Sequence, residues 1–277
     1  MSAATWVNGA MLAEGLAGID PLDHGVTVGD GLFETVRVID GGTVFWVRHL
    51  RRLRRAAARI GLDVSLDDAT LTSAASQVLH AAGVVDGRLR VTVTSGPGPL
   101  GPIRPTGPTT VVIAAATSPP APDAARVVTV PWVRNERSPL AGLKSTSYGE
   151  GVVILTHARA HGADEALLAD TTGRLSEAVT ANVFVGVGGV LLTPTLETGC
   201  LPGIVREVLL ERGVGAASDL PMGVVGRADE IFLTSSTRGV TPVSHVDGRA
   251  LPSVGGPLTT VASEDLALAV TTDLSNR

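Results

Sequence analysis

The sequence predicts a mixed α+β protein of two domains, a small N-terminal α/β domain followed by a larger mixed α+β domain. A length of 277 residues suits two modest domains, and 44% hydrophobic with 18% charged residues is typical of a well-buried globular chain. Strand and helix patterns follow one another without a regular βαβ repeat. Residues 117–123 contain three prolines and predict a stiff linker, so we expect domains over residues 1–116 and 124–277.

The N-terminal segment predicts a strand-rich domain with a helical insert. Asn8-Gly9 and Asp40-Gly41-Gly42 are turn signals between short β-prone stretches. Gly61 and Gly83 each follow a stretch with helical spacing of apolar residues, which they would end. The expected strands are 5–8, 11–12, 32–39, 43–47, 88–94 and 109–115, and the expected helices are 49–60 and 66–82. The Gly- and Pro-rich residues 95–102 predict a functional loop.

The C-terminal segment also contains both strand and helix patterns. Apolar and β-branched stretches alternate with helical patterns, and no internal repeat or glycine-rich phosphate loop of the GxGxxG or Walker type is present. The expected strands are 127–130, 165–169, 181–187 and 230–234, and the expected helices are 148–161 and 203–212.

Charge and cysteine content exclude several classes of protein. A net charge of −5 gives no overall basic surface for nucleic acid or an anionic membrane, so neither is expected as a partner. The single Cys200 excludes an internal disulfide and a cysteine-based zinc site, and no metal site is expected. No apolar stretch approaches the roughly 20 residues that span a bilayer. We therefore expect a cytoplasmic protein.

One residue stands out in the composition. Lys144 is the single lysine among 22 lysine and arginine residues. Arginine stays protonated and cannot act as a nucleophilic amine, whereas a lysine amine can lose its proton and form an imine with an aldehyde or ketone. A chance surface lysine is the alternative. The small residues around it, Ala141-Gly-Leu-Lys-Ser-Thr146, would let a flat ligand approach.

Four further segments could carry chemistry, and each has a simpler interpretation. Glu177 lies at the edge of an apolar strand, where it would need a cationic or hydrogen-bonding partner if buried, or would be a solvated turn residue. Residues 199–206 form a Pro/Gly turn before a helix, which could seat a phosphate or be an ordinary helix start. Residues 234–237 are four hydroxyl side chains that could donate to an anion or cap a loop. Residues 48–59 contain six arginines. They could form a helix that binds nucleic acid. We expect instead that most of them form a solvated face and that one turns inward to bind a phosphate.

A lysine amine, a carboxylate and two anion seats together match the needs of pyridoxal 5'-phosphate. The lysine would form the imine, the carboxylate would keep the pyridine nitrogen protonated, and arginine with N–H and hydroxyl donors would hold the phosphate.

On these motifs the chain resembles the class IV aminotransferases, the fold-type IV pyridoxal-phosphate enzymes. The resemblance runs almost end to end, and its motifs are Gly29-Asp-Gly-Leu-Phe-Glu-Thr-Val-Arg37, His49-Leu-Arg-Arg52, Leu143-Lys-Ser145, Ser176-Glu177 with Ala181-Asn-Val-Phe184, Gly203-Ile-Val-Arg206 and Ser235-Ser-Thr237. It implies that Lys144 is the Schiff-base lysine and catalytic residue, and that Glu177 meets the pyridine nitrogen. It further implies phosphate binding by Arg52, Ile204, Val205 and Ser236, and homodimers. We predict substrate contacts for Phe33, Arg104 and Thr237.

The resemblance leaves the reaction open between two kinds of activity. Many family members have threonine where this chain has Val205, and aminodeoxychorismate lyases resemble this chain in often lacking a hydroxyl there. The lyase pattern extends to Ala141-Gly-Leu-Lys144, whereas Ser235–Pro242 is closer to the transaminases. The expected activity is 4-amino-4-deoxychorismate lyase, which releases pyruvate and 4-aminobenzoate. The alternatives are a transaminase of branched-chain or D-amino acids or amines, and a carrier or cofactor-free relative without enzyme activity.

Overall fold

The computed structural model describes residues 4–12 and 18–276. Its contacts divide the chain into two compact units, which are described separately below. Unit 1 comprises Met1–Pro119 and Leu143–Tyr148, and unit 2 comprises Pro120–Gly142 and Gly149–Arg277.

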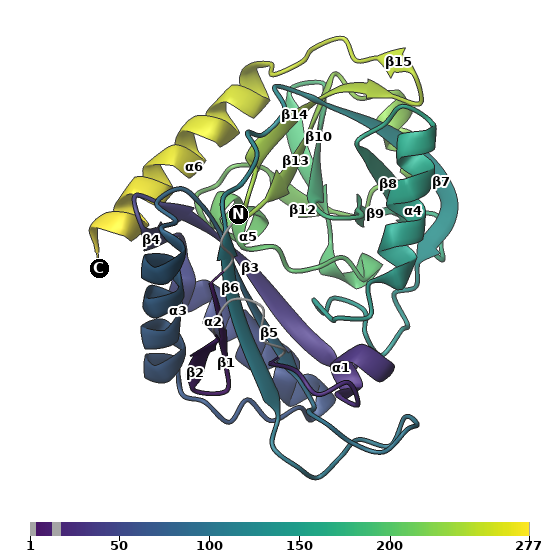
Figure 1. The fold of residues 1–277 in the computed structure, drawn as a ribbon. Coiled ribbons are helices and arrows are strands. Elements are labelled where there is room, and N and C mark those ends of the chain that lie inside the picture. The colour runs from purple at the N-terminus through teal and green to yellow at the C-terminus, as the bar shows by residue number, and fades with distance from the viewer. Residues whose placement is uncertain (1–3, 13–17, 277) are drawn as a thin grey trace. The chain divides into compact units, whose positions relative to one another are not determined.

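Unit 1 is a six-stranded sheet with two long helices, α2 and α3 (Figure 1). The strand order is β2-β1-β6-β5-β3-β4, and every neighbouring pair is antiparallel. The strands are β1 (Thr5–Val7), β2 (Ala10–Leu12), β3 (Gly31–Ile39), β4 (Gly42–Thr43), β5 (Gly87–Thr94) and β6 (Thr110–Ala116), and the helices are α1 (His24–Thr27), α2 (Trp46–Ile60) and α3 (Asp68–Ala82).

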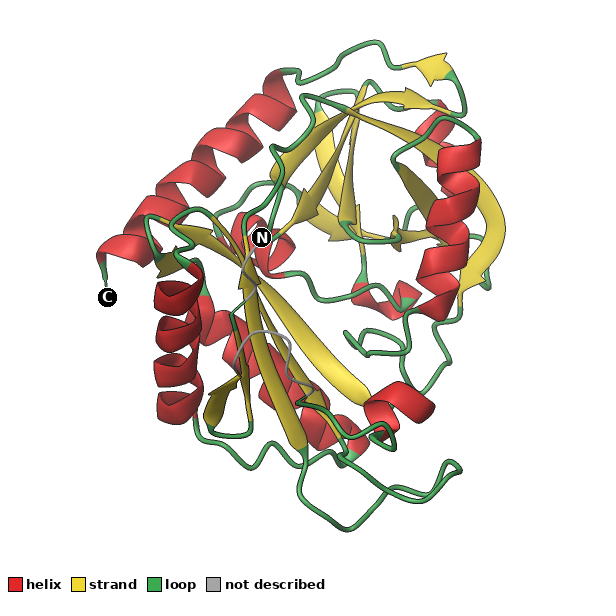
Figure 2. Ribbon diagram, viewed as in Figure 1, coloured by secondary structure: helices red, strands yellow, loops and turns green. Residues whose placement is uncertain are grey.

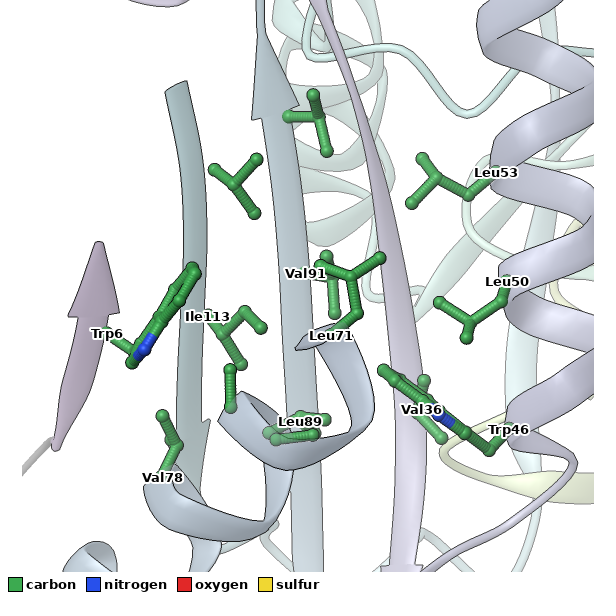
Figure 3. Close-up of a cluster of buried hydrophobic side chains, with 14 of the residues drawn as sticks. Trp6, Val36, Trp46, Leu50, Leu53, Leu71, Val78, Leu89, Val91 and Ile113 are labelled. Carbon is green, nitrogen blue, oxygen red and sulfur yellow. The ribbon is translucent and has the colours of Figure 1, made fainter. Parts of the chain in front are cut away.

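One face of this sheet packs against α2 and α3. Leu50 and Leu53 of α2 and Leu71 of α3 point towards alternate strand residues, among them Val36 and Val91 (Figure 3). Residues at alternate positions of a strand share a face, so the residues between them, such as Phe33 and Arg90, lie on the opposite face. The core of unit 1 therefore orients Phe33 away from the helices.

Local signals fix the ends of the two helices. Asp67 caps α3, where its side chain accepts the Thr70 N–H at 2.7 Å. Gly61 and Gly83 end α2 and α3 in left-handed conformations, with φ of 64° and 61°. Both stops agree with the sequence prediction.

Unit 2 contains a nine-stranded mixed sheet. Figure 2 draws the strands of both sheets in yellow. The strand order is β12-β11-β10-β13-β14-β7-β8-β9, with β15 paired to β14. The strands are β7 (Ala125–Arg134), β8 (Glu165–Asp170), β9 (Leu175–Ala178), β10 (Asn182–Val187), β11 (Val190–Pro194), β12 (Ala216–Ser218), β13 (Glu230–Ser235), β14 (Gly239–Val246) and β15 (Arg249–Ala250). The helices are α4 (Gly149–Ala160), α5 (Ile204–Glu211) and α6 (Pro257–Ser275), with 3-10 turns η1 (Leu196–Thr198) and η2 (Met222–Gly226).

Alternation along β10 and β13 separates two apolar layers of unit 2. Val183, Val185 and Ile231 belong to the largest core cluster of this unit. Phe184 and Phe232 face the other way and stack with ring centroids 4.9 Å apart. Both faces of these central strands are thus buried, which gives rigid support to the turns at their ends.

The structure differs from the sequence predictions at several places. The predicted strand 43–47 holds only at Thr43 of β4, because the backbone turns at Phe45 into a left-handed conformation (φ 55°) and α2 begins at Trp46. The sequence analysis did not predict α1, α6, β9, β11, β12, β14 or β15. Residues 143–148 associate with unit 1, although they follow the predicted linker, because their backbone pairs with β3. Within the described part of the chain, no helix is both long and apolar enough to cross a membrane.

Candidate active site

The backbone around Lys144 is held against the start of β3. The Phe33 N–H donates to the Lys144 carbonyl at 2.9 Å, and the Thr146 N–H donates to the Gly31 carbonyl at 2.9 Å. The hydroxyls of Thr146 and Ser147 both donate to the Gly29 carbonyl, at 2.8 and 2.9 Å. Four hydrogen bonds thus fix the position of the lysine along the strand.

The side chain of Lys144 lies over aromatic rings. Its Nζ is 4.4 Å from the centroid of the Phe33 ring and 5.9 Å from that of Tyr148, and the two rings meet edge to face at 5.6 Å. The guanidinium carbon of Arg90 lies 3.7 Å from the Phe33 centroid. Aromatic faces attract cations, so Phe33 gathers two positive side chains. The predicted substrate residue Phe33 is therefore next to the predicted catalytic lysine, while its contact with substrate stays a prediction.

A buried charged cluster joins β3 to α2. Glu34 accepts from Arg52 Nε at 2.8 Å and Arg52 Nη2 at 2.5 Å, and it accepts from His49 Nδ1 at 2.7 Å. Burial by itself would raise the pKa of Glu34, but the charge of Arg52 and the hydrogen bonds from both partners lower it to about 2. Burial lowers the pKa of His49, which keeps this imidazole neutral. The cluster therefore carries one negative and one positive charge.

Arg52 is the arginine of α2 that turns inward. It is 6% exposed, whereas Arg51 and Arg55 are exposed, which confirms the expectation of a solvated face with one buried arginine. Its Nε and Nη2 bind Glu34, and the sequence analysis predicts that Arg52 also contacts the cofactor phosphate. That contact remains a prediction.

In unit 2, both carboxylate oxygens of Glu177 have partners. Oε2 accepts the Leu201 N–H at 2.9 Å, and Oε1 lies 3.0 Å from Arg134 Nε. The Arg134 contact is an ion pair whose angle is poor for a hydrogen bond. Glu177 is 6% exposed, so these partners offset the cost of burying its charge. The solvated-turn alternative for Glu177 is therefore wrong, and the expected cationic partner is Arg134.

The turn before α5 presents backbone N–H groups at Ile204 and Val205. Gly203 is the N-cap and contributes no side-chain cap, and Asn182 Nδ2 donates to the Leu201 carbonyl at 2.8 Å. A Cβ at Gly203 would collide with the Asn182 Oδ1, so only glycine fits there. The first N–H groups of a helix lack intrahelical acceptors and favour an anion.

Ser236 and Thr237 lie in the hairpin turn between β13 and β14. Arg238 holds this turn, because its Nη2 donates to Glu165 Oε1 at 2.9 Å and to Thr180 Oγ1 at 2.8 Å. Glu165 is fully buried at the start of β8. The turn thus has a fixed conformation, and the hydroxyls predicted to bind phosphate and substrate belong to it.

These groups fit pyridoxal phosphate in their chemistry. The cofactor carries an aldehyde, a pyridine nitrogen and a phosphate. Unit 1 offers the Lys144 amine and the Arg52 guanidinium. Unit 2 offers the Glu177 carboxylate, which is paired with Arg134, and the uncapped start of α5. The buried Thr234 hydroxyl, which has no partner among the described residues, adds a further donor beside the hairpin turn.

Sequence reasoning missed several residues that hold the site. The partner of Arg52 is Glu34, and the partner of Glu177 is Arg134. The hairpin turn is held by the pair of Arg238 with Glu165. Glu34 could have been found, because an acid in a strand that alternates with buried residues needs a cation. The other three residues make contacts between segments far apart in the sequence, so no local signal marks them. Arg104, predicted to contact substrate, donates hydrogen bonds to Asp30 and to the Ile60 carbonyl.

Comparisons with known proteins show the family of this chain. Residues 31–246 match the family Amino-transferase class IV. The D-alanine aminotransferase of Bacillus licheniformis is 31% identical over 261 residues, covering 91% of this chain and 92% of that protein. The aminodeoxychorismate lyase of Bacillus subtilis (strain 168) is 25% identical over 254 residues, covering 87% and 86%. The T.th. branched-chain amino acid aminotransferase, solved in complex with N-(5'-phosphopyridoxyl)-L-glutamate, superposes with a TM-score of 0.87 at 25% identity over 97% and 94% of the two chains.

The match covers most of the sequence, and it includes Lys144, Arg52, Glu177, the turn before α5 and the β13–β14 hairpin. The predicted family and the predicted mixed α+β fold are confirmed. This chain belongs to the class IV aminotransferase family.

Proposed function

We propose that the protein is a pyridoxal-phosphate enzyme whose cofactor is attached to Lys144. The observation that carries this proposal is the position of the chain's single lysine, which four hydrogen bonds and two aromatic rings hold at the start of β3. Family membership supports the same role. A carrier or cofactor-free relative would have no need to keep all three of Lys144, Arg52 and Glu177.

Each predicted residue then has a defined task. When bound, pyridoxal phosphate supplies an electron sink for the carbon that bears the substrate amine. Glu177 holds a proton on the pyridine nitrogen by its negative charge, which Arg134 and the Leu201 N–H keep in place. Arg52, the N–H groups of Ile204 and Val205, and the Ser236 hydroxyl bind the phosphate.

We propose 4-amino-4-deoxychorismate lyase as the reaction. Lys144 Nζ takes the proton from the ring carbon that bears nitrogen. The bond between the ring and the enolpyruvyl oxygen breaks, its electron pair leaves with that oxygen, and protonation gives pyruvate. The ring becomes aromatic as 4-aminobenzoate, which drives the reaction without any oxidant. Val205 and the sequence Ala141-Gly-Leu-Lys144 support this choice because both resemble lyases.

A transaminase is the second candidate. The higher identity to a D-alanine aminotransferase, 31% against 25% for a lyase, favours it. In that reaction Lys144 Nζ would take the proton from the substrate carbon that bears the amine and then give it up again, and the product would be a keto acid. Both reactions use the same cofactor contacts, so the substrate decides between them.

Product analysis distinguishes the two reactions. Purified protein with pyridoxal phosphate is given aminodeoxychorismate, D-alanine with 2-oxoglutarate, or L-leucine with 2-oxoglutarate. We expect pyruvate and 4-aminobenzoate in equal amounts from the first. Glutamate formation from either amino acid, without 4-aminobenzoate from aminodeoxychorismate, would replace the lyase with the transaminase. No turnover with any of them, and no absorbance from lysine-bound cofactor, would contradict the whole proposal.

A further inference from the structure

Arg104 lies in the Gly- and Pro-rich loop between β5 and β6, and all three of its guanidinium nitrogens are bonded within unit 1. Nε donates to Asp30 Oδ2 and Nη2 donates to Asp30 Oδ1, both at 2.7 Å. Nη1 donates to the Ile60 carbonyl, also at 2.7 Å. A two-point pair between arginine and a carboxylate fixes the relative orientation of the two groups. The Arg104 hydrogen bond is also the main reason that the pKa of Asp30 is lowered.

Asp30 stands between the two glycines that hold the lysine segment. The Gly29 carbonyl accepts the Thr146 and Ser147 hydroxyls, and the Gly31 carbonyl accepts the Thr146 N–H. Packing here is tight, because a Cβ on Gly31 would lie 2.7 Å from the Val93 carbonyl oxygen and 3.0 Å from the Thr146 hydroxyl. A rotation of the backbone at Asp30 would therefore displace residues 145–147 and the lysine beside them.

The third bond of Arg104 reaches the other element that carries a cofactor residue. Ile60 is the last residue of α2, the helix that holds His49 and Arg52. A cation at a helix C-terminus satisfies a carbonyl that has no intrahelical partner and is favoured by the helix dipole. One guanidinium thus joins the start of β3, which holds the lysine segment, to the end of α2.

We propose that Arg104 is a positioning residue, which acts through Asp30 to set the place of Lys144, and that it does not contact substrate. The proposal rests on the proposed function, since it assumes that Lys144 carries the cofactor. A contact with substrate would require Arg104 to give up a bidentate pair that is only partly exposed, at 34% for the arginine and 21% for the aspartate side chain.

The test compares Arg104→Met, Arg104→Lys, Asp30→Asn and the Arg104→Met/Asp30→Asn double variant. Arg54→Met is the matched control. Arg54 also pairs with an aspartate in the same unit, through two hydrogen bonds to Asp68 Oδ1, and it donates to the Val64 carbonyl, but it is remote in sequence from Lys144. Measured for each are the melting temperature, kcat and KM on the accepted substrate, and the rate at which added pyridoxal phosphate becomes reducible onto Lys144 by borohydride.

Arg104→Met and Asp30→Asn should each lower kcat and the attachment rate by about ten- to a hundredfold, as expected when a reacting group is misplaced, with KM changed by less than about threefold. The double variant should lower kcat and the attachment rate no further than the single variants do, since each single substitution already removes the Arg104–Asp30 pair. Arg104→Lys should recover only part of the loss, because an ammonium cannot form the two-point pair. Arg54→Met should lower the melting temperature without changing kcat or attachment.

Two other results would overturn the inference. A large rise in KM for Arg104→Met with no effect of Asp30→Asn would show a direct substrate contact. Arg104→Met and Arg54→Met with equal effects on attachment would show a merely structural role. A wild-type protein in which borohydride attaches no cofactor to Lys144 would instead contradict the proposed function itself.

Discussion

Labelling of Lys144 can be assigned directly, because the chain contains no other lysine side chain. Lys144→Ala should abolish turnover, and Lys144→Arg should be nearly as inactive although it keeps the positive charge over the Phe33 ring. A guanidinium cannot bond covalently to the cofactor aldehyde. Mass spectrometry after borohydride reduction should find the cofactor on the Lys144 peptide of the wild type and on no peptide of either variant.

Glu177→Gln tests whether the carboxylate acts by its charge. The amide can still accept the Leu201 N–H, so we expect the fold to persist and the turnover number at saturating cofactor to fall sharply. Glu150→Gln is the control, because Glu150 lies 4.0 Å from the same Arg134 but is 64% exposed. Loss of the Glu150 charge should change the activation free energy by no more than about 0.5 kcal/mol. Equal effects of the two substitutions would remove Glu177 from the mechanism.

Cys200 lies next to Leu201, whose N–H binds Glu177. Burial and the charge of Glu177 raise the pKa of the Cys200 thiol to about 11. A raised pKa keeps the thiol protonated up to that range, and the thiolate is the reactive form. We expect a maleimide to leave the native protein unlabelled at pH 8 and to label Cys200 once denaturant is added. Rapid labelling of the native protein would show that this turn opens.

At the scale of elements, the Glu34–Arg52–His49 cluster joins β3 to α2. Glu34→Gln should lower the free energy of unfolding at pH 7 by about 3 kcal/mol, because it leaves Arg52 buried without its counter-charge. Asp68→Asn, which breaks the exposed pair with Arg54, should cost less than about 1 kcal/mol. Denaturant titration measures both.

The same cluster predicts how stability depends on pH. The pKa of Glu34 falls from 4.5 to about 2 on folding, so its contribution is complete above pH 4.5 and is lost as the pH falls towards 2. The difference between wild type and Glu34→Gln should shrink over that interval. A difference that stays constant would show that Glu34 is already protonated in the folded protein.

The elements also show how far local pattern determines structure. Leu50, Leu53, Ala57 and Ile60 recur at helical spacing in the sequence, and in α2 the first three are buried and Ile60 is partly buried. Residues 43–47 are β-prone by composition, yet Val44 and Phe45 form a turn and Trp46 begins α2, with all three side chains buried. Tertiary packing here overrides propensity. The pairing of Lys144 with β3 joins distant segments, so the sequence identified the residue but could not place it.

At the scale of the whole molecule, cofactor binding should stabilise the folded chain. A ligand that binds only the folded state adds about 2.7 kcal/mol at a hundred times its Kd. Pyridoxal phosphate should therefore raise the melting temperature of the cofactor-free protein in proportion to the logarithm of its concentration. Arg52→Ala should reduce this shift, whereas Arg51→Ala, on the exposed face of α2, should not. Equal shifts in both variants would show that Arg52 does not bind the phosphate.

The assignment of residues 143–148 to unit 1 has a consequence for protein engineering. The hexapeptide 143–148, which contains Lys144, belongs structurally to residues 1–119 but is encoded between two stretches of unit 2. A chimera that exchanges only the first 119 residues with those of a relative would place a native lysine segment against a foreign strand. Recombination that preserves function should therefore need three breakpoints, after residues 119, 142 and 148, so that β3 and the lysine are inherited together.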